Sequence, residues 1–462
     1  MASDRFKQEL KQEAERWRQD AWITPQQYTQ LVEHYQLEAL EAGAQGRFTK
    51  TLIGIGGILI GISVITFVSA NWQLIPRVVK VGLLVGVFLA VNITGARLLQ
   101  QPRHQRLGQS LLLAGALILG GNLALMGQMF HQSGSGYGLC LVWGVGVLAM
   151  AYGLRNPPLG ILAQVLVGAG YVLWLRDVPA FGIGASPGLD LLLKQMPLLT
   201  PLAFLPLAYR RRSRPLFTLT ALGLIVALLA NLGQLAAIAL PTGFFIALAI
   251  ALPVSLLWTY PDAGVPAPTA TSEESIPSLR PLSRAIALLY LGVTFYSLSF
   301  GWVWNVDPPA LAPDPPFMSP WISVIVLGVL AVCGWLYLGW PRRRGRWGWS
   351  SVDMALLGLL GLGAGMAVVH WQWLPLPTEA TFVFNVLLAV LGVGTMREGL
   401  DDGDRSQFWY GLVLLVLQIF SRVLEYNTGL LLKSFTFLLC GIAVIVLGLW
   451  FERHIRPASR SV

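Results

Sequence analysis

Charged residues near the end of the chain are the first candidates for chemistry, because they interrupt strongly apolar stretches. Arg422 and Glu425 lie three positions apart in the apolar run 408–427, so on a helix their side chains share one face. Lys433 follows at a similar depth in the next apolar run, 429–451. Charges in apolar surroundings are costly. The group therefore either forms a ligand site, or Arg422 and Glu425 neutralise each other and extend toward a polar boundary.

Other polar side chains lie where further apolar runs end. They are Asn71, Trp72, Gln128, His131, His370 and Trp371. A tryptophan at such a place is typical of an anchor between an apolar layer and water, and a lone histidine is commonly a satisfied polar group. Together with Arg422, Glu425 and Lys433, these residues form the predicted ligand-binding layer. No residue is predicted to be catalytic.

The sequence does not indicate metal, redox or hydrolase chemistry. Cys140, Cys333 and Cys440 each lie inside an apolar run without the spacing of metal ligands, so we interpret them as small buried side chains. The chain contains no HExxH motif, and its histidines lie far apart. We therefore expect no metal and no cofactor.

The elements that must position these residues are long apolar runs. The first, residues 52–70, contains nineteen residues without a charge. As a helix it would be roughly 28 Å long, which is the thickness of the hydrocarbon core of a bilayer. Comparable runs cover residues 78–96, 109–130, 137–153, 158–175, 190–209, 215–235, 241–260, 284–303, 321–340, 354–374, 380–396, 408–427 and 429–451. The runs predict about fourteen membrane helices. The weakest runs lie in 190–260, and the total is twelve or thirteen if not all of them are separate spans.

Composition supports this interpretation. The mean hydropathy is +0.62, and only 12% of the residues are charged, about half the usual share in a soluble domain. The fold class predicted is an all-α, multi-pass integral membrane helix bundle. The net charge of +9 does not indicate nucleic acid, because the basic residues cluster between apolar runs.

The same basic residues predict the orientation of the chain. With the N-terminus in the cytoplasm, the 32 lysines and arginines fall on the cytoplasmic side with a few exceptions, which are Arg77, Lys80, Arg176, Lys194, Arg422 and Lys433. This distribution favours both termini inside and an even number of helices. The expected location is the inner membrane of a bacterial cell.

Four segments lie outside the predicted spans. Residues 1–50 are expected to form a cytoplasmic amphipathic helical hairpin, with Thr24 to Gln27 as a capping box. This hairpin lies on the membrane or on a protein partner, or it stays solvated and loosely docked. Segment 261–280 is a flexible cytoplasmic linker, and segment 305–320 is a proline-rich outer loop. Residues 454–462 form a basic cytoplasmic tail, and residues 51–453 form the transmembrane domain.

Amides inside the apolar runs are expected to form hydrogen bonds between helices. They are Asn92, Asn122, Gln164, Asn231, Asn385 and Gln418. The frequent glycines, such as those in 358–365, are expected to allow close approach of neighbouring helices.

Several short motifs resemble a known family. They are Trp17, then Trp22 to Gln27, the glycines 57 to 61 leading to Ala70-Asn71-Trp72 and Pro76, and Gly127-Gln128-Met129-Phe130-His131-Gln132-Ser133-Gly134 with Trp143. Over roughly residues 1–155 the chain resembles the bacterial membrane proteins of domain of unknown function 2157. The resemblance implies a multi-pass membrane protein with a cytoplasmic N-terminal hairpin, and it implies no established activity.

Three functions remain open from the sequence. The favoured one is a non-pumping transporter or a protein that binds a lipid or small solute in an outward-facing polar layer, because no carboxylate lies near the predicted midplane. The second is a scaffold, sensor or assembly factor that acts through residues 1–50. An intramembrane transferase is the least favoured, because the first outer loop has no acidic pair and the histidines lie far apart in the sequence.

Overall fold

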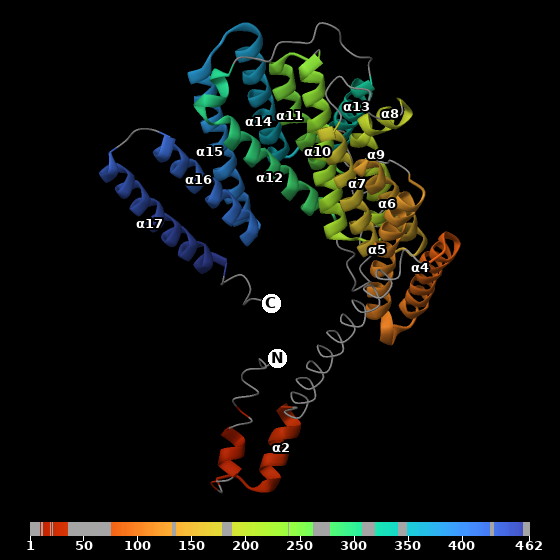
Figure 1. Cartoon of the computed structure of the whole chain (residues 1–462). Coiled ribbons are helices and arrows are strands. Elements are labelled where there is room, and N and C mark those ends of the chain that lie inside the picture. The colour runs from red at the N-terminus through yellow and green to blue at the C-terminus, as the bar shows by residue number, and fades with distance from the viewer. Residues whose placement is uncertain are drawn as a thin grey trace. The chain divides into compact units, whose positions relative to one another are not determined.

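The structure is a computed structural model of the whole chain (Figure 1). It describes residues 10, 13–18, 20, 22–35, 75–131, 135–177, 187–238, 240–261, 278–306, 319–340, 349–425 and 429–455. These residues form helices and turns, and none of them lies in a strand. The chain divides into two compact units, residues 1–86 and 87–462, and each is described by itself.

The first unit contains the predicted capping box. Residues 13–18 are helical, and helix α2 covers Pro25–Tyr35. The Thr24 amide donates to Gln27 Oε1 at 2.9 Å, and the Gln27 amide donates back to Thr24 Oγ1 at 3.3 Å. Tyr28 Oη donates to Glu15 at 3.4 Å, which joins the two helical segments. The predicted box is therefore confirmed. Helix α4, Arg77–Leu99, begins in this unit.

The second unit is a bundle of helices with short connections. Its helices are α5 (Gln105–Met129), α6 (Gly136–Gly153), α7 (Pro157–Asp177), α8 (Pro187–Lys194), α9 (Met196–Arg210), α10 (Arg214–Ile238), α11 (Thr242–Trp258), α12 (Arg280–Leu298), α13 (Ser319–Gly339), α14 (Ser351–Val368), α15 (Pro377–Asp401), α16 (Arg405–Glu425) and α17 (Leu430–Ile455). Three single-turn helices join them, η2 (Pro102–His104), η3 (Gly301–Asn305) and η4 (Val369–Trp373).

Ten helices of the described residues are long and apolar enough to cross a membrane. The bent pair α8 and α9 would make eleven if it is one span, and α11 is apolar but shorter. Every predicted run from residue 78 onward falls on a helix. The run 52–70 and most of segments 261–280 and 305–320 lie outside the described residues. The total of fourteen helices therefore stays a prediction.

Helices α10 and α11 lie between the earlier and the later helices of this unit and pack on both groups. Helix α10 packs on α7, α9 and α13, and α11 packs on α12 and α14. Helices α15 and α16 form a close pair beside α12, and α17 packs on α16 at the edge of the bundle (Figure 1). The largest core cluster runs from Leu112 to Leu414 and includes Trp174, Phe295 and Phe384.

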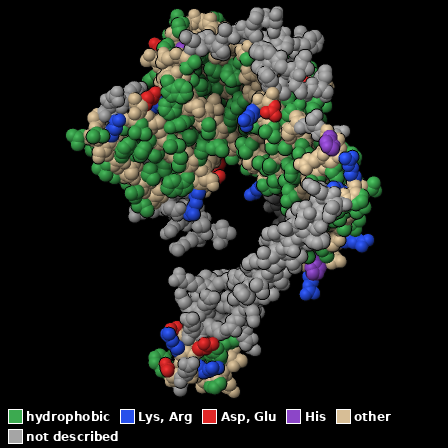
Figure 2. Space-filling view, viewed as in Figure 1, with side chains coloured by type: hydrophobic (Ala, Val, Ile, Leu, Met, Phe, Trp, Pro, Cys, Tyr) green, Lys and Arg blue, Asp and Glu red, His purple; other side chains and the backbone are tan. Residues whose placement is uncertain are grey.

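Apolar side chains also cover the outside of this bundle. The visible face of residues 87–462 is largely hydrophobic, with few charged side chains on it (Figure 2). Large side chains such as Val142, Val145 and Val329 are more than half exposed in the middle of their helices. Such a surface would be unstable in water and is stable in lipid, so these helices belong to a membrane protein.

Helices α8 and α9 form a broken helix with a bend of 71° at Gln195. Asn231 of α10 is fully buried, and its Nδ2 donates to the Lys194 carbonyl at 2.6 Å and to Ser323 Oγ at 2.9 Å. The amide thus satisfies a carbonyl that the end of α8 leaves free. Lys194 also pairs with Asp190 one turn earlier, at 2.7 Å. The prediction that Asn231 bonds between helices is confirmed.

Candidate functional site

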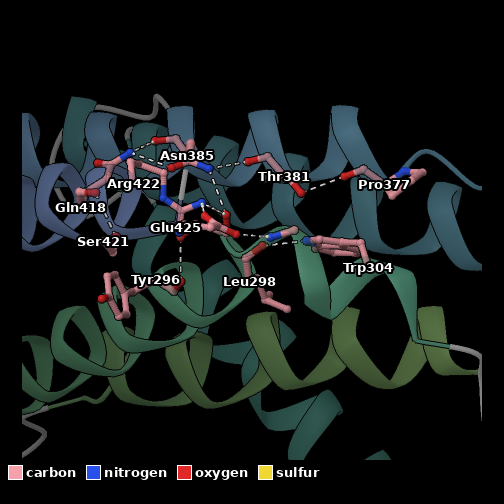
Figure 3. A network of polar contacts seen from close by, with 12 residues as sticks. Tyr296, Leu298, Trp304, Pro377, Thr381, Asn385, Gln418, Ser421, Arg422 and Glu425 are labelled. Atoms are coloured by element: carbon pink, nitrogen blue, oxygen red, sulfur yellow. Dashed lines mark hydrogen bonds and ion pairs between the residues drawn. The ribbon is translucent and has the colours of Figure 1, made fainter. Parts of the chain in front are cut away.

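Helix α12 ends among the predicted site residues. The last carbonyls of a helix have no intrahelical partner, so other groups must satisfy them. Arg422 Nη1 donates to the Ser299 carbonyl at 2.8 Å, and Asn385 Nδ2 donates to the same oxygen at 3.0 Å. Trp304 Nε1 donates to the Leu298 carbonyl at 2.7 Å. Side chains from α15, α16 and η3 thus meet at the end of α12 (Figure 3).

Arg422 is held on three sides. It pairs with Glu425, three residues later on the same helix, as the sequence spacing predicts. Its guanidinium lies over the ring of Phe300, 4.5 Å from the centroid. A cation at a helix C-terminus is also favoured by the helix dipole, which adds to the bond with Ser299. Its Nε is buried without a hydrogen-bond partner.

Glu425 and two amides extend this network. Glu425 Oε1 accepts a hydrogen bond from the Gly301 amide at 3.2 Å, so the carboxylate ties α16 to η3. Gln418 Nε2 donates to the Asn385 carbonyl at 2.7 Å, and Asn385 also bonds to Thr381 of its own helix at 2.8 Å. The predicted interhelical bonding of Asn385 and Gln418 is therefore confirmed (Figure 3).

A cavity of about 590 Å³ adjoins the network, and we call it the Arg422 cavity. It is lined by Gly301, Asn305, Pro377, Thr378, Thr381, Phe382, Asn385, Arg422 and Glu425. The lining offers one cation, one anion, two amides and two hydroxyls. Such a set can bind a ligand with hydroxyls or with charges of both signs, and it favours neither a pure anion nor a pure cation.

His370 lies at the same end of the bundle, beside Trp304, but does not line the Arg422 cavity. It sits in the π-helical turn η4, is 5% exposed, and accepts a hydrogen bond on Nδ1 from the Leu376 amide at 2.9 Å. Its Nε2 lies 3.2 Å from the Trp304 carbonyl and therefore carries the hydrogen. Both ring nitrogens are used, so His370 links η4 to η3 and leaves no nitrogen for a ligand.

The structure does not bring all the predicted residues together. Gln128 and His131 are exposed at the end of α5, which packs on α6 and α7 and not beside α16. Trp371 contacts α11 at Gly243, and Lys433 lies in the first turn of α17. None of these four lines the Arg422 cavity, and the wider ligand-binding layer stays a prediction. Asn71 and Trp72 lie outside the described residues.

A second charged site at the opposite end of α12 was missed by the sequence reasoning. Asp353 is 5% exposed, and it accepts hydrogen bonds from Trp258 Nε1 at 2.8 Å and from the Ser350 amide at 3.1 Å. Ser350 and Asp353 form a capping box at the start of α14. That Ser-x-x-Asp pattern was a signal in the sequence that could have identified the site.

Arg284 completes this second site. Its guanidinium lies over the Trp258 ring, 4.4 Å from the centroid, and its Nη2 is 3.6 Å from Asp353 Oδ1. Glu398 of α15 is within electrostatic range of Arg284 and accepts a hydrogen bond from Gln407 at 3.1 Å. A cavity of about 420 Å³ lies here, with Trp258 and Glu398 in its lining. Asp353 lies in the first turn of α14, where the helix dipole favours an acid.

Two of the predicted interhelical amides behave differently. Asn92 Nδ2 donates to the Phe88 carbonyl of its own helix at 2.8 Å, so the interhelical prediction is wrong for this bond. Gln164 is 5% exposed and its Oε1 is buried without a partner. The prediction is wrong for this oxygen too, because the neighbouring helix presents Gly223 at this position.

Among the described residues, no group of three or more His, Cys, Asp or Glu side chains is arranged to hold a metal ion. Cys140, Cys333 and Cys440 are free thiols.

The apolar exterior and the long helices define the protein as a multi-pass integral membrane helix bundle. Residues 15–160 match the model of the family described as predicted membrane protein (DUF2157). The resemblance inferred from the N-terminal motif at Trp22 to Gln27 and from the motif at Gly127 to Gly134 is therefore confirmed for this part of the chain. No curated protein and no solved structure matches the chain significantly.

Proposed function

We propose that this protein is a non-pumping transporter or lipid- and solute-binding protein of a bacterial inner membrane. The observation that carries the proposal is the Arg422 cavity, in which Arg422 and Glu425 face a space of about 590 Å³. The side chains of Arg422 and Glu425 are 16% and 25% exposed, so this ion pair is partly shielded from water and can still contact a ligand. The buried Arg422 Nε without a partner is a further donor beside this space.

The lining favours a zwitterionic ligand. Arg422 can donate hydrogen bonds to a phosphate or a carboxylate, and Glu425 can accept them from an ammonium group. Thr378 and Asn305 can form hydrogen bonds with hydroxyls or ester oxygens. Two sources have this chemistry. One is the headgroup of phosphatidylethanolamine in the membrane, and the other is a free zwitterionic solute of similar size.

The positions of the acidic groups support a passive role. Asp353 lies in the first turn of α14, Glu398 in the last turn of α15, and Glu425 at the last residue of α16. Groups that couple transport to protons usually lie near the midplane of the membrane. All three carboxylates lie near helix ends and away from the midplane, which is the arrangement expected of a facilitator.

The test compares a lipid with its free headgroup. The full-length protein in nanodiscs is titrated with dioleoylphosphatidylethanolamine or with glycerophosphoethanolamine, and binding is read by native mass spectrometry and by thermal shift. Arg422→Ala should weaken binding about tenfold or more, as for the loss of a charged hydrogen bond. Arg397→Ala removes a residue whose side chain is 83% exposed at the other end of the bundle, and it should have no effect.

A further variant separates binding from folding, because Arg422 also holds α12. Thr378 is exposed, lines the cavity and makes no bond in the network. Thr378→Val should weaken binding without lowering the unfolding temperature. Binding of the lipid alone would indicate a lipid-binding protein, and binding of the free headgroup a solute carrier. Unchanged binding in both variants would contradict the proposal.

A second candidate is a scaffold that acts through the N-terminal helices. Trp22 is 77% exposed beside the capping box at Thr24, which is typical of a residue that docks on a partner. Deletion of residues 2–45 should abolish the activity of a scaffold and leave ligand binding at the Arg422 cavity unchanged. If the deletion also abolished ligand binding, the N-terminal helices would not act independently of the bundle, and this second candidate would be contradicted.

A further inference from the structure

A second, uncharged cavity lies inside the bundle between α7, α9 and α10. Its volume is about 230 Å³, and Gln164, Tyr171, Thr200 and Gly223 are among its lining residues, none of which carries a charge. Gln164 and Tyr171 lie seven residues apart, which places them on one face of α7, about two turns and roughly 10 Å from each other. This cavity is separate from the Arg422 cavity and shares no residue with it.

Two polar groups of this cavity have no partner in the protein. Gln164 and Tyr171 are 5% and 3% exposed, and both Gln164 Oε1 and Tyr171 Oη are buried without a hydrogen bond. A buried oxygen without a partner costs about 1–3 kcal/mol, and such groups are rare in folded proteins. The residues that carry these two oxygens line one cavity, which indicates a ligand that completes their bonding.

The cavity is flanked by side chains that face the lipid. Val165 and Val172 of α7 and Leu222 and Val226 of α10 line it, and each is 44% or more exposed. In a membrane protein, exposed apolar residues in the middle of a span contact acyl chains. A ligand can therefore reach Gln164 and Tyr171 from the bilayer, between α7 and α10.

Gly223 of α10 leaves room for the Gln164 amide at the edge of the cavity. A Cβ at residue 223 would lie 2.6 Å from Gln164 Nε2 and 3.2 Å from Thr200 Cγ2. Thr200 belongs to α9, the second half of the broken helix, and Met196 in the first turn of α9 also lines the cavity. Discontinuous helices next to polar groups at membrane depth are common where transporters bind their ligands.

We propose that this cavity binds the free hydroxyl of an uncharged lipid, such as a diacylglycerol, which enters from the bilayer. A hydroxyl both donates and accepts, so it can donate to Gln164 Oε1 or bond to Tyr171 Oη in either direction. The absence of charge in the lining disfavours a phospholipid headgroup, and the apolar flanks accommodate the acyl chains.

The test uses the full-length protein in nanodiscs of dioleoylphosphatidylcholine with a photoreactive diacylglycerol that carries a diazirine. Cross-linked peptides are mapped by mass spectrometry, and they should come from α7, α9 and α10. Dioleoylglycerol should compete for labelling, and triolein, which has the same chains but no free hydroxyl, should not. Tyr171→Phe and Gln164→Leu should each weaken this competition about fivefold to tenfold, as for the loss of one hydrogen bond.

A matched pair of glycine variants controls for packing. Gly223→Ala should push the Gln164 amide into the cavity and reduce labelling several-fold, whereas Gly233→Ala, on the same helix but with open space around the added methyl group, should not. If Gln164→Leu does not fold, Tyr171→Phe removes a single oxygen and provides the same test. Equal competition by triolein, competition by glycerol instead, or labelling that these variants leave unchanged would each overturn the proposal.

Discussion

Asp353 accepts hydrogen bonds from Trp258 of α11 and from Ser350, and it faces Arg284 of α12. Replacement by alanine removes both acceptors and leaves the Arg284 charge without its carboxylate. We therefore expect Asp353→Ala to lower the free energy of unfolding by about 1–3 kcal/mol. The check is a thermal or detergent-induced unfolding curve of the purified protein.

The control for this variant is Asp401, which is 72% exposed and pairs with Arg397 only at 3.8 Å. Asp401→Ala should change the free energy of unfolding by no more than about 0.5 kcal/mol. Equal effects of the two variants would contradict a structural role for Asp353 in joining α11, α12 and α14.

At the residue scale, the sequence predicts an ion pair within one helix more easily than the groups that this pair binds on neighbouring elements. The spacing of Arg422 and Glu425 places them together on α16, and the structure confirms their ion pair. The groups they bind on the neighbouring elements are the carbonyl of Ser299 and the amide of Gly301. Every residue carries such backbone groups, so no side-chain type marks them. Asp353 likewise meets Trp258 across 95 residues of sequence, which no local pattern contains.

At the scale of helices, the pair α15 and α16 depends on direct contact of their backbones. A Cβ at residue 411 would lie 2.7 Å from the Met396 amide nitrogen and 2.7 Å from Thr395 Oγ1. Gly411→Ala should therefore force the two helices apart and lower the free energy of unfolding by about 1–3 kcal/mol. The separation also moves Arg422, at the end of α16, away from Ser299.

Gly394→Ala is the matched control, because a methyl group at this position of α15 meets nothing within 4 Å. Both variants should be measured by the unfolding curve used for Asp353 and by ligand binding at the Arg422 cavity. If Gly411→Ala unfolds like Gly394→Ala, the close approach of α15 and α16 contributes nothing to stability.

The existence of the helices could be predicted, and their irregular points could not. A segment in lipid must satisfy its backbone groups internally, so each long apolar run predicts a helix. The bend at Gln195 and the π-helical turn at His370 depend on partners from other elements, such as Asn231 for the Lys194 carbonyl. Prolines in the run 190–209 indicated a weak span but could not specify the 71° bend.

At the scale of the molecule, α12, α14 and α16 run in one direction and α15 runs in the other, and these helices separate two polar ends. Arg422 and Asn385 lie at one end, and Asp353 and Glu398 lie at the other. The basic connectors Arg210 to Arg214 and Arg397 to Arg405 have the positions that the positive-inside rule assigns to the cytoplasm. We infer that the Asp353 end faces the cytoplasm and that the Arg422 cavity opens to the outside.

Cysteine labelling tests this orientation across one helix. Gln372 in η4, before the start of α15, and Asp402, directly after its end, are both exposed. Helix α15 has 25 residues and is about 37 Å long. In a chain whose three cysteines are replaced by alanine, a membrane-impermeant maleimide should label Gln372→Cys in intact spheroplasts and Asp402→Cys only after lysis. The reverse pattern would invert the orientation and place the Arg422 cavity on the cytoplasmic side. Labelling of both variants in intact spheroplasts would contradict a span between them, because the reagent does not cross the membrane.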